Sequence, residues 1–271
     1  MLACAVGGAV GGWLVWRAGR RLWARPSFRG LNFRGVDVPT AAGVAVVLPV
    51  AAVVAVHGWD RAWGPFLIVA VGFGGFGLLD DLAGRQHGGP GGGSSGFGGH
   101  LGALARGRVT TGLLKLAGGS VAALVAAAVW HRGLGLWAVA DAALIALAAN
   151  VANLFDRAPG RAGKVALVSA AALLVATRAP SRLGPVATMA GAAAVLLVYD
   201  LRERLMLGDT GANCLGAVLG LGVVEAAGPA ARLSVLTLVV VLNALSEIIS
   251  FGAVIGRVAI LRALDQVGRR R

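Results

Sequence analysis

Long, nearly uncharged apolar runs are the feature that most constrains the fold of this chain. They recur along its whole length, for example at 41–56, 113–130, 134–149, 186–198 and 233–249. A helix needs roughly 17–25 mostly apolar residues to cross a bilayer. Inside hydrocarbon only helices or closed barrels satisfy the backbone, and the chain has no strand alternation of useful length. The fold class is therefore predicted to be all-α, a polytopic bundle of transmembrane helices.

Composition and spacing set the number of spans. Only 14% of the 271 residues are charged, whereas soluble domains carry about 25%. The first sixteen residues have no basic segment before their apolar run, so they are interpreted as a span and not as a signal peptide. The nine predicted spans are about 1–16, 41–57, 63–79, 113–130, 134–153, 163–177, 184–199, 211–227 and 231–255. They form one integral membrane domain over 1–271, with a flexible Gly-rich loop at 82–112 and a basic tail at 256–271.

The distribution of positive charge predicts the orientation. Twenty of the 25 Lys and Arg residues fall in alternate gaps and after the last span. Because cytoplasmic loops carry the excess of Lys and Arg, this side is placed in the cytoplasm, with the N-terminus outside and the C-terminus inside. The net charge of +13 then favours anionic lipid headgroups over nucleic acid as its partner. We expect a multi-pass protein of the inner (plasma) membrane.

Three polar clusters lie at span ends on this basic side. Their members are Asp80 and Asp81, then Asn150, Asn153 and Asp156, then Asp209. Each has an ordinary explanation alone: a solvated helix end, hydrogen bonding between helices, or an N-cap. A spacing of three places the second cluster on one helix face. Three such clusters on the cytoplasmic side together favour a site.

Magnesium chemistry explains why acids would gather there. Mg²⁺ binds hard oxygen ligands, often one or two carboxylates plus substrate phosphates. The metal removes the repulsion between carboxylates and a diphosphate and stabilises the leaving group. Lys115, Arg161 and Lys164 are candidates to bind the remaining phosphate oxygens.

The order of these motifs resembles a known family. Asp-Asp stands at the end of 77–81, Thr-Thr-Gly-x-x-Lys at 110–115, Asn-x-x-Asn-x-x-Asp at 150–156, Gly-Asp-Thr-Gly within 206–212, and Pro-Thr-Ala-Ala-Gly at 39–43. Over about residues 30–255 the chain resembles the polyprenyl-phosphate N-acetylhexosamine-1-phosphate transferase family. The family includes the enzymes that make the first lipid intermediate of peptidoglycan.

The resemblance implies an Mg²⁺-dependent enzyme of cell-envelope polysaccharide or peptidoglycan precursor synthesis. Polyprenyl phosphate would attack the β-phosphate of a UDP-sugar and release UMP. By matching position, Asp209 would be the Mg²⁺ ligand, and Asp80 and Asp81 would be catalytic, binding the lipid phosphate or, for Asp81, the metal. Asp156 would be catalytic too, and with Asn150 and Asn153 it would hold the nucleotide-sugar.

The chain also departs from the family pattern. Pro159 stands where the family has a second Asp, and no histidine follows the eighth span. Arg157 and Arg161 are candidates to bind diphosphate in compensation. Two alternatives stay open: a catalytically silent relative that binds polyprenyl phosphate, and a transporter, which should show inverted repeats. A homodimer is left open.

Other residues carry weaker signals. Asp141 and Glu247 fall within predicted spans, where an acid is a functional candidate. Cys4 and Cys214 are predicted to be small buried side chains. The G-x-G-x-x-G match at 72–77 lies inside an apolar span, so it indicates helix packing and not a dinucleotide site.

Overall fold

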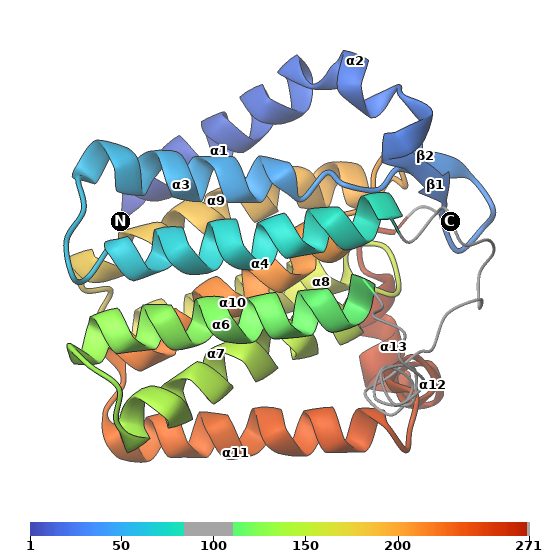
Figure 1. The fold of residues 1–271 in the computed structure, drawn as a ribbon. Helices are drawn as coiled ribbons and strands as arrows, with labels where there is room; N and C mark the ends of the chain where they lie inside the picture. Colours follow the sequence, from blue (N-terminus) through green and yellow to red (C-terminus); the bar gives the residue numbers. More distant parts are fainter. Residues whose placement is uncertain (84–110, 270–271) are drawn as a thin grey trace.

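Helices make up nearly all of the structure, a computed structural model that describes residues 1–83 and 111–269. In these ranges the helices of 14 residues or more are α1 (Leu2–Ala18), α3 (Val44–His57), α4 (Gly64–Ala83), α6 (Thr111–His131), α7 (Leu136–Phe155), α8 (Arg161–Ala176), α9 (Gly184–Asp200), α10 (Gly208–Ala226) and α11 (Pro229–Ser246). Figure 1 shows them packed side by side along the length of the molecule. The prediction of an all-α bundle is confirmed.

Several of these helices suit a bilayer. In the described part of the chain, five are long and apolar enough to cross a membrane: α4, α6, α7, the continuous segment Ser181–Asp200 that ends in α9, and α11. The apolar helices α1 and α3 are shorter. The chain is therefore a helical membrane protein. The nine spans and their orientation stay predictions.

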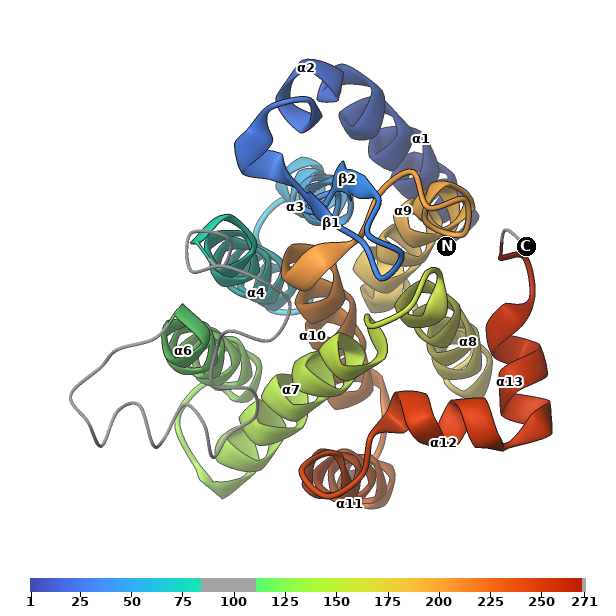
Figure 2. The same ribbon diagram turned by 90° about the vertical axis from the view of Figure 1, so that its right-hand side faces the viewer.

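Helix α10 is the centre of the bundle. It packs against α3, α4, α7, α8 and α9, and nearly all of its residues are buried. Figure 2 shows the other helices arranged around it. Small residues permit this close packing: a Cβ on Gly77 would meet the Asp209 backbone, and one on Gly43 would meet the Gly211 backbone. Glycine lets helix backbones approach this closely in a membrane bundle.

A small β-ribbon interrupts the helices near the N-terminus. After α2 (Arg20–Trp23) and a 3₁₀ turn (Pro26–Phe28), β1 (Arg29–Leu31) pairs antiparallel with β2 (Asp37–Pro39). Strands of three residues leave no pattern long enough to detect, so the sequence did not predict them. The ribbon is anchored to the start of α10, because the Met206 amide donates to the Pro39 carbonyl at 2.7 Å.

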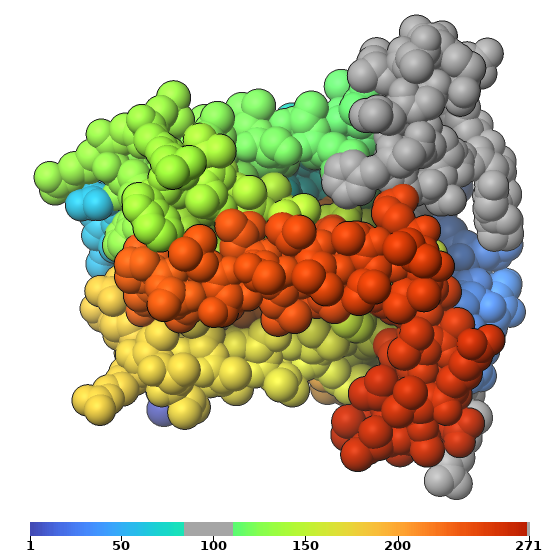
Figure 3. All heavy atoms as spheres, turned by 90° about the horizontal axis from the view of Figure 1, so that it is seen from below, coloured from blue at the N-terminus to red at the C-terminus, as the bar shows by residue number. Residues whose placement is uncertain are grey.

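The end of the chain differs from the prediction. The span predicted at 231–255 is too long, because α11 ends at Ser246 and the chain turns into α12 (Phe251–Arg257) and α13 (Ala259–Gln266). Ser250 caps the start of α12, accepting a hydrogen bond from the Ala253 amide at 3.4 Å. Figure 3 shows α11 along the outside of the bundle, with α12 and α13 turned across its end.

The two predicted non-membrane segments have different outcomes. Most of the Gly-rich loop predicted at 82–112 lies outside the described residues; its flanks, 82–83 and 111–112, are helical. The basic tail predicted at 256–271 contains α13. Its last two residues also lie outside the described part.

Candidate active site

Four helix ends converge at the end of the bundle that carries the C-terminus. The last turns of α4 and α7 and the first turns of α6 and α10 all lie there (Figures 1 and 2). This convergence brings together the predicted residues Asp80, Asp81, Lys115, Asp156 and Asp209. Adjacent antiparallel helices explain it, because residues far apart in sequence reach the same end when successive helices reverse direction.

Lys115 joins two of the carboxylates. Its Nζ forms an ion pair with Oδ2 of Asp209 and lies 3.1 Å from Oδ2 of Asp80. The Thr111 hydroxyl donates to the other oxygen of Asp80 at 2.6 Å. Residues from α4, α6 and α10 thus place two carboxylates around one positive charge. The site is mostly shielded from water, which strengthens these ion pairs relative to exposed ones.

Asp81 caps α10 from a neighbouring helix. One carboxylate oxygen accepts the Asp209 amide at 2.9 Å, and the other accepts the Thr210 amide at 2.9 Å and the Thr210 hydroxyl at 2.6 Å. The first turn of a helix has free N–H groups, and a carboxylate satisfies them well. The geometry gives Asp81 a positioning role for Asp209, and its predicted role as a metal ligand stays a prediction.

Asp156 lies at the C-terminal end of α7, outside the apolar span. The residue as a whole is partly exposed, but protein atoms packed around its carboxyl group shield that group from water. This burial raises the pKa of Asp156 well above its ordinary value, and the nearby charges of Asp200, Asp209 and Asp81 raise it further. An excess of negative charge therefore surrounds this position, which a bound cation would relieve.

A polar cavity of about 500 Å³ opens beside the carboxylates. It is lined by Lys115, Asn150, Asn153, Arg157 and Glu247, together with small and apolar residues of α6 and α7 and the segment that joins α11 to α12. Two of the predicted substrate-binding residues, Asn150 and Asn153, thus share a cavity with Lys115. Glu247, which the sequence singled out as an acid near the inner end of a span, lines the same cavity from the end of α11.

One wall of this cavity is held by an amide pair. Asn150 donates from Nδ2 to Oδ1 of Asn243 at 2.5 Å, and Asn243 donates to the Val239 carbonyl at 2.6 Å. This hydrogen bond joins α7 to α11. Asn150 is therefore partly engaged in helix packing, which was the alternative explanation for the Asn-x-x-Asn-x-x-Asp stripe.

The other two predicted phosphate-binding cations lie elsewhere. Arg161 forms a bidentate pair with Asp265, with Nε and an Nη at 2.8 and 2.9 Å, and Lys164 donates to main-chain carbonyls of 264–267. The structure does not bring Arg161 and Lys164 to the carboxylates. They line an almost wholly apolar cavity of about 790 Å³ between α8, α11, α12 and α13.

The residues present fit a magnesium ion in part. In the described ranges no three His, Cys, Asp or Glu side chains form a group that could hold a metal. Mg²⁺ commonly uses only one or two carboxylates and completes its shell with water and phosphate oxygens. Asp80 and Asp209 already share one cation, the ammonium of Lys115, so this pair is the donor set that fits.

Several contributing residues were not predicted. They are Thr111, Thr210 and Asn243, described above, and Asp200, whose Oδ2 accepts the Gly160 amide at 2.9 Å. Asp200 could have been found as an acid ending an apolar span on the basic side. Asp141, by contrast, lies at the opposite end of the bundle and pairs with His131 and Arg232, each at 2.7 Å.

Fold and site together define a helical membrane protein with a shielded carboxylate–lysine cluster beside a polar cavity. A comparison of the chain with models of protein families and with curated proteins finds no match.

Proposed function

We propose that this protein is an Mg²⁺-dependent phosphoglycosyl transferase that moves a sugar-1-phosphate from a UDP-sugar to polyprenyl phosphate. A phosphate oxygen of the lipid forms a bond to the β-phosphorus of the UDP-sugar. The bond from that phosphorus to the oxygen bridging to the α-phosphorus breaks, and UMP leaves. The products are a polyprenyl-diphosphate-sugar and UMP, for use in cell-envelope polysaccharide or peptidoglycan precursor synthesis.

One observation carries this proposal. The ammonium of Lys115 is shared by Asp80 and Asp209, residues from three helices that are distant in sequence. Two shielded carboxylates around a single positive charge leave an excess of negative charge, which suits them to hold a divalent cation that also binds a diphosphate. Support comes also from the order of the motifs, which the resemblance described above connects with this chemistry.

The chain's own residues have separable roles in the proposed reaction. Asp80 and Asp209 are the proposed ligands of Mg²⁺, which when bound neutralises charge on the diphosphate. Asp81 holds the first turn of α10, and so the Asp209 side chain, in place through its hydrogen bonds to Asp209 and Thr210. Lys115, which pairs with both carboxylates, would be the cation available to a phosphate group of the substrate.

The two cavities suit the two substrates. The polar cavity of about 500 Å³ offers amides, an arginine and a lysine to a nucleotide-sugar, with Asn153 and Arg157 proposed to contact the donor. The apolar cavity of about 790 Å³ offers hydrocarbon contact to a prenyl chain. Because small-molecule sites combine apolar walls with a few polar groups, we assign the lipid to the second cavity. We assign the carboxylate–lysine cluster to the cytoplasmic side of the inner membrane.

The test is an assay of UMP release by the purified full chain with polyprenyl phosphate, MgCl₂ and a panel of UDP-sugars. We expect release with at least one donor, and its loss by about 100-fold or more in Asp209→Asn and Asp80→Asn, since charge-stabilising groups carry roughly 10²–10³ in rate. Asp60→Asn is the matched control, because Asp60 lies in the α3–α4 loop at the other end of the bundle.

The second candidate is a catalytically silent relative that binds polyprenyl phosphate. It is favoured by Pro159 at the position of the family's second Asp. Lipid binding without UMP release from any donor, under conditions in which an active family member turns over, would select this alternative. Mg²⁺ would then leave the affinity for the lipid unchanged in the wild type and in Asp209→Asn alike.

A further inference from the structure

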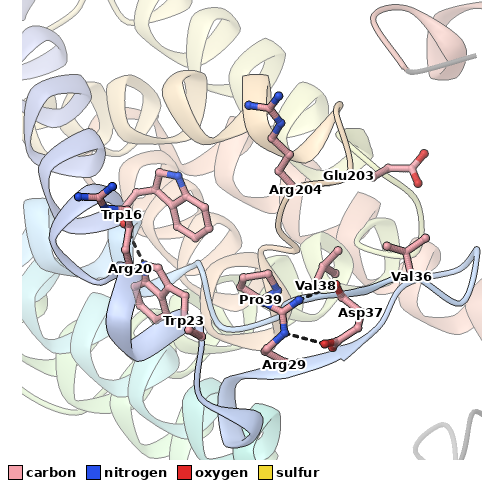
Figure 4. Close-up of a pocket in the computed structure, with 11 residues that line it drawn as sticks. Trp16, Arg20, Trp23, Arg29, Val36, Asp37, Val38, Pro39, Glu203 and Arg204 are labelled. Atoms are coloured by element: carbon pink, nitrogen blue, oxygen red, sulfur yellow. Dashed lines mark hydrogen bonds and ion pairs between the residues drawn. The ribbon is translucent and has the colours of Figure 1, made fainter.

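A separate cavity of about 350 Å³ lies where the end of α1 meets the β-ribbon and the loop before α10. Figure 4 shows its lining: Trp16, Arg20 and Trp23 come from α1 and α2, Arg29 and Asp37 from the ribbon, and Arg204 from the loop. It shares no lining residue with the polar or the apolar cavity described above.

The acids around this cavity are already neutralised. Asp37 forms an ion pair with Arg29 at 2.6 Å, and Glu203 forms one with Arg34 at 3.2 Å. Asn32 also donates to Glu203 at 3.2 Å. Each acid therefore has its own arginine, and neither is left to compensate a further positive charge.

Two guanidinium groups remain. Among the residues that the structure describes, Arg20 and Arg204 have no carboxylate partner; Arg20 donates only to the Arg17 carbonyl at 3.2 Å. Both side chains are exposed. The cavity thus presents two uncompensated positive charges, and an arginine guanidinium matches the geometry of a phosphate group.

The loop aims Arg204 away from the acid next to it. Glu203 has a φ of 55°, which is unusual for a residue with a side chain. Figure 4 shows Glu203 and Arg204 pointing in opposite directions from this turn. The separation keeps the Glu203 carboxylate with Arg34 and leaves Arg204 free for another anion.

Aromatic rings form a rigid wall of the cavity. Trp16 stacks on Trp23 with ring centroids 5.9 Å apart, and Trp23 donates from its indole nitrogen to the Trp16 carbonyl at 3.0 Å. Trp16 also packs against Tyr199 of α9, with the two ring centroids 5.7 Å apart. Tryptophan rings of this kind occupy the headgroup level of membranes.

Helix α1, whose last turns reach this cavity, also carries an exposed apolar face. Leu2, Val6, Val10 and Leu14 are exposed along it. In a membrane protein such a face contacts acyl chains. The acyl chains of a lipid whose phosphate is held at the cavity have this face available on the same helix, and a soluble phosphate ester would not use it.

We propose that this cavity is a binding site for the phosphate of an anionic glycerophospholipid, held by Arg20 and Arg204 against the Trp16 ring. The acyl chains lie along the exposed face of α1. Because Met206 and Pro39 hydrogen-bond at 2.7 Å, an occupied site also steadies the segment that leads to α10.

The test is a binding titration of the purified full chain with short-chain dihexanoyl-phosphatidylglycerol, below its micelle concentration. The variant is R20Q/R204Q, and the matched control is R21Q/R202Q, which removes the same charge from exposed arginines outside the cavity. One arginine near anionic lipid typically strengthens binding by about fivefold. The loss of two arginines in R20Q/R204Q should therefore weaken binding by about thirtyfold. The control should bind within about threefold of the wild type.

Other arms decide what is recognised. R20K/R204K keeps the charge on the same side chains and should retain most of the affinity. Dihexanoyl-phosphatidylcholine should bind at least about tenfold more weakly. An equal loss in the control pair, or equal binding of phosphatidylcholine, would overturn the proposal. Competition by sn-glycerol-1-phosphate at the affinity of the lipid would overturn the lipid assignment and leave a soluble phosphate ester as the ligand. If R20Q/R204Q does not fold, R204Q is compared with R202Q, and the expected loss of affinity is about fivefold.

Discussion

Replacing Lys115 by methionine separates the two roles of the carboxylate cluster. The change removes the positive charge shared by Asp80 and Asp209 but keeps the length and apolar stem of the side chain. The two carboxylates are then left close together without a positive charge between them, although Asp80 keeps its hydrogen bond from the Thr111 hydroxyl. We expect the variant to be less stable without Mg²⁺ and to be stabilised by Mg²⁺ more than the wild type.

The size of the effect follows from the exposure of the pair. Removing one partner of a buried ion pair costs about 3–5 kcal/mol. The side chains of Lys115, Asp80 and Asp209 keep 15%, 20% and 26% of their surface, so solvent reduces the expected cost to about 2–3 kcal/mol. At about 2–4 °C per kcal/mol for a protein near this size, the apparent melting temperature should fall by about 4–12 °C.

Magnesium should restore most of that loss. A ligand that binds only the folded state adds about 2.7 kcal/mol at one hundred times its Kd. The assay is thermal unfolding in detergent, followed by tryptophan fluorescence over a series of MgCl₂ concentrations. Lys164→Met is the matched control, since Lys164 donates to main-chain carbonyls and, within the described ranges 1–83 and 111–269, to no carboxylate.

The reasoning is refuted if Mg²⁺ stabilises Lys115→Met no more than Lys164→Met. It is equally refuted if the double variant K115M/D209N keeps the full response to Mg²⁺, because Asp209 would then not be a ligand. Calcium in place of magnesium separates a selective site from a general response to divalent charge.

Three further predictions concern single contacts. Asp81→Asn should cost about 2–4 kcal/mol in unfolding free energy, measured by denaturant titration, because an amide cannot accept all the hydrogen bonds made by the carboxylate. In a double-mutant cycle, Asn150→Ala and Asn243→Ala should show a coupling energy of about 0.5–1.5 kcal/mol, and a value near zero would mean that the amide pair does not join α7 to α11. Burial opposes ionisation of Asp265, but the hydrogen bonds and charges of its arginine partners outweigh burial and lower the pKa of Asp265. Docking of 259–266 should therefore be fully stable above the ordinary pKa of about 3.9 and be lost as the pH falls through the lowered value. The measurement is hydrogen exchange of this segment, and exchange that does not change across that pH range would contradict the prediction.

The helical class was predictable because it depends on local composition. Runs such as 113–130 and 134–149 favour membrane-spanning helices by their length and composition alone. The end of the last span was not predictable in this way. Ile248 and Ile249 extend the apolar run past Ser246, whereas the turn at Ser250 depends on a cap and on the packing of α12 across the bundle.

The members of the candidate site were predictable, but their roles were not. Polar residues at span ends are visible one at a time, and their common side of the membrane follows from counting spans. Nothing in the sequence says that the oxygens of Asp81 accept hydrogen bonds from the first turn of α10, or that Arg161 faces Asp265. Such pairings depend on which helices are neighbours.

The amino-acid sequence alone determined that this chain forms apolar helices, because burial of uncharged side chains in hydrocarbon is a property of each segment taken by itself. It also determined which polar residues stand at the helix ends, since these follow directly from where each apolar run stops. Only the tertiary structure decided that Lys115 lies between Asp80 and Asp209 while Arg161 and Lys164 lie away from them. The physical reason is that ion pairs act over a few ångströms, so they are set by the packing of helices around α10 and not by the spacing of residues along the chain.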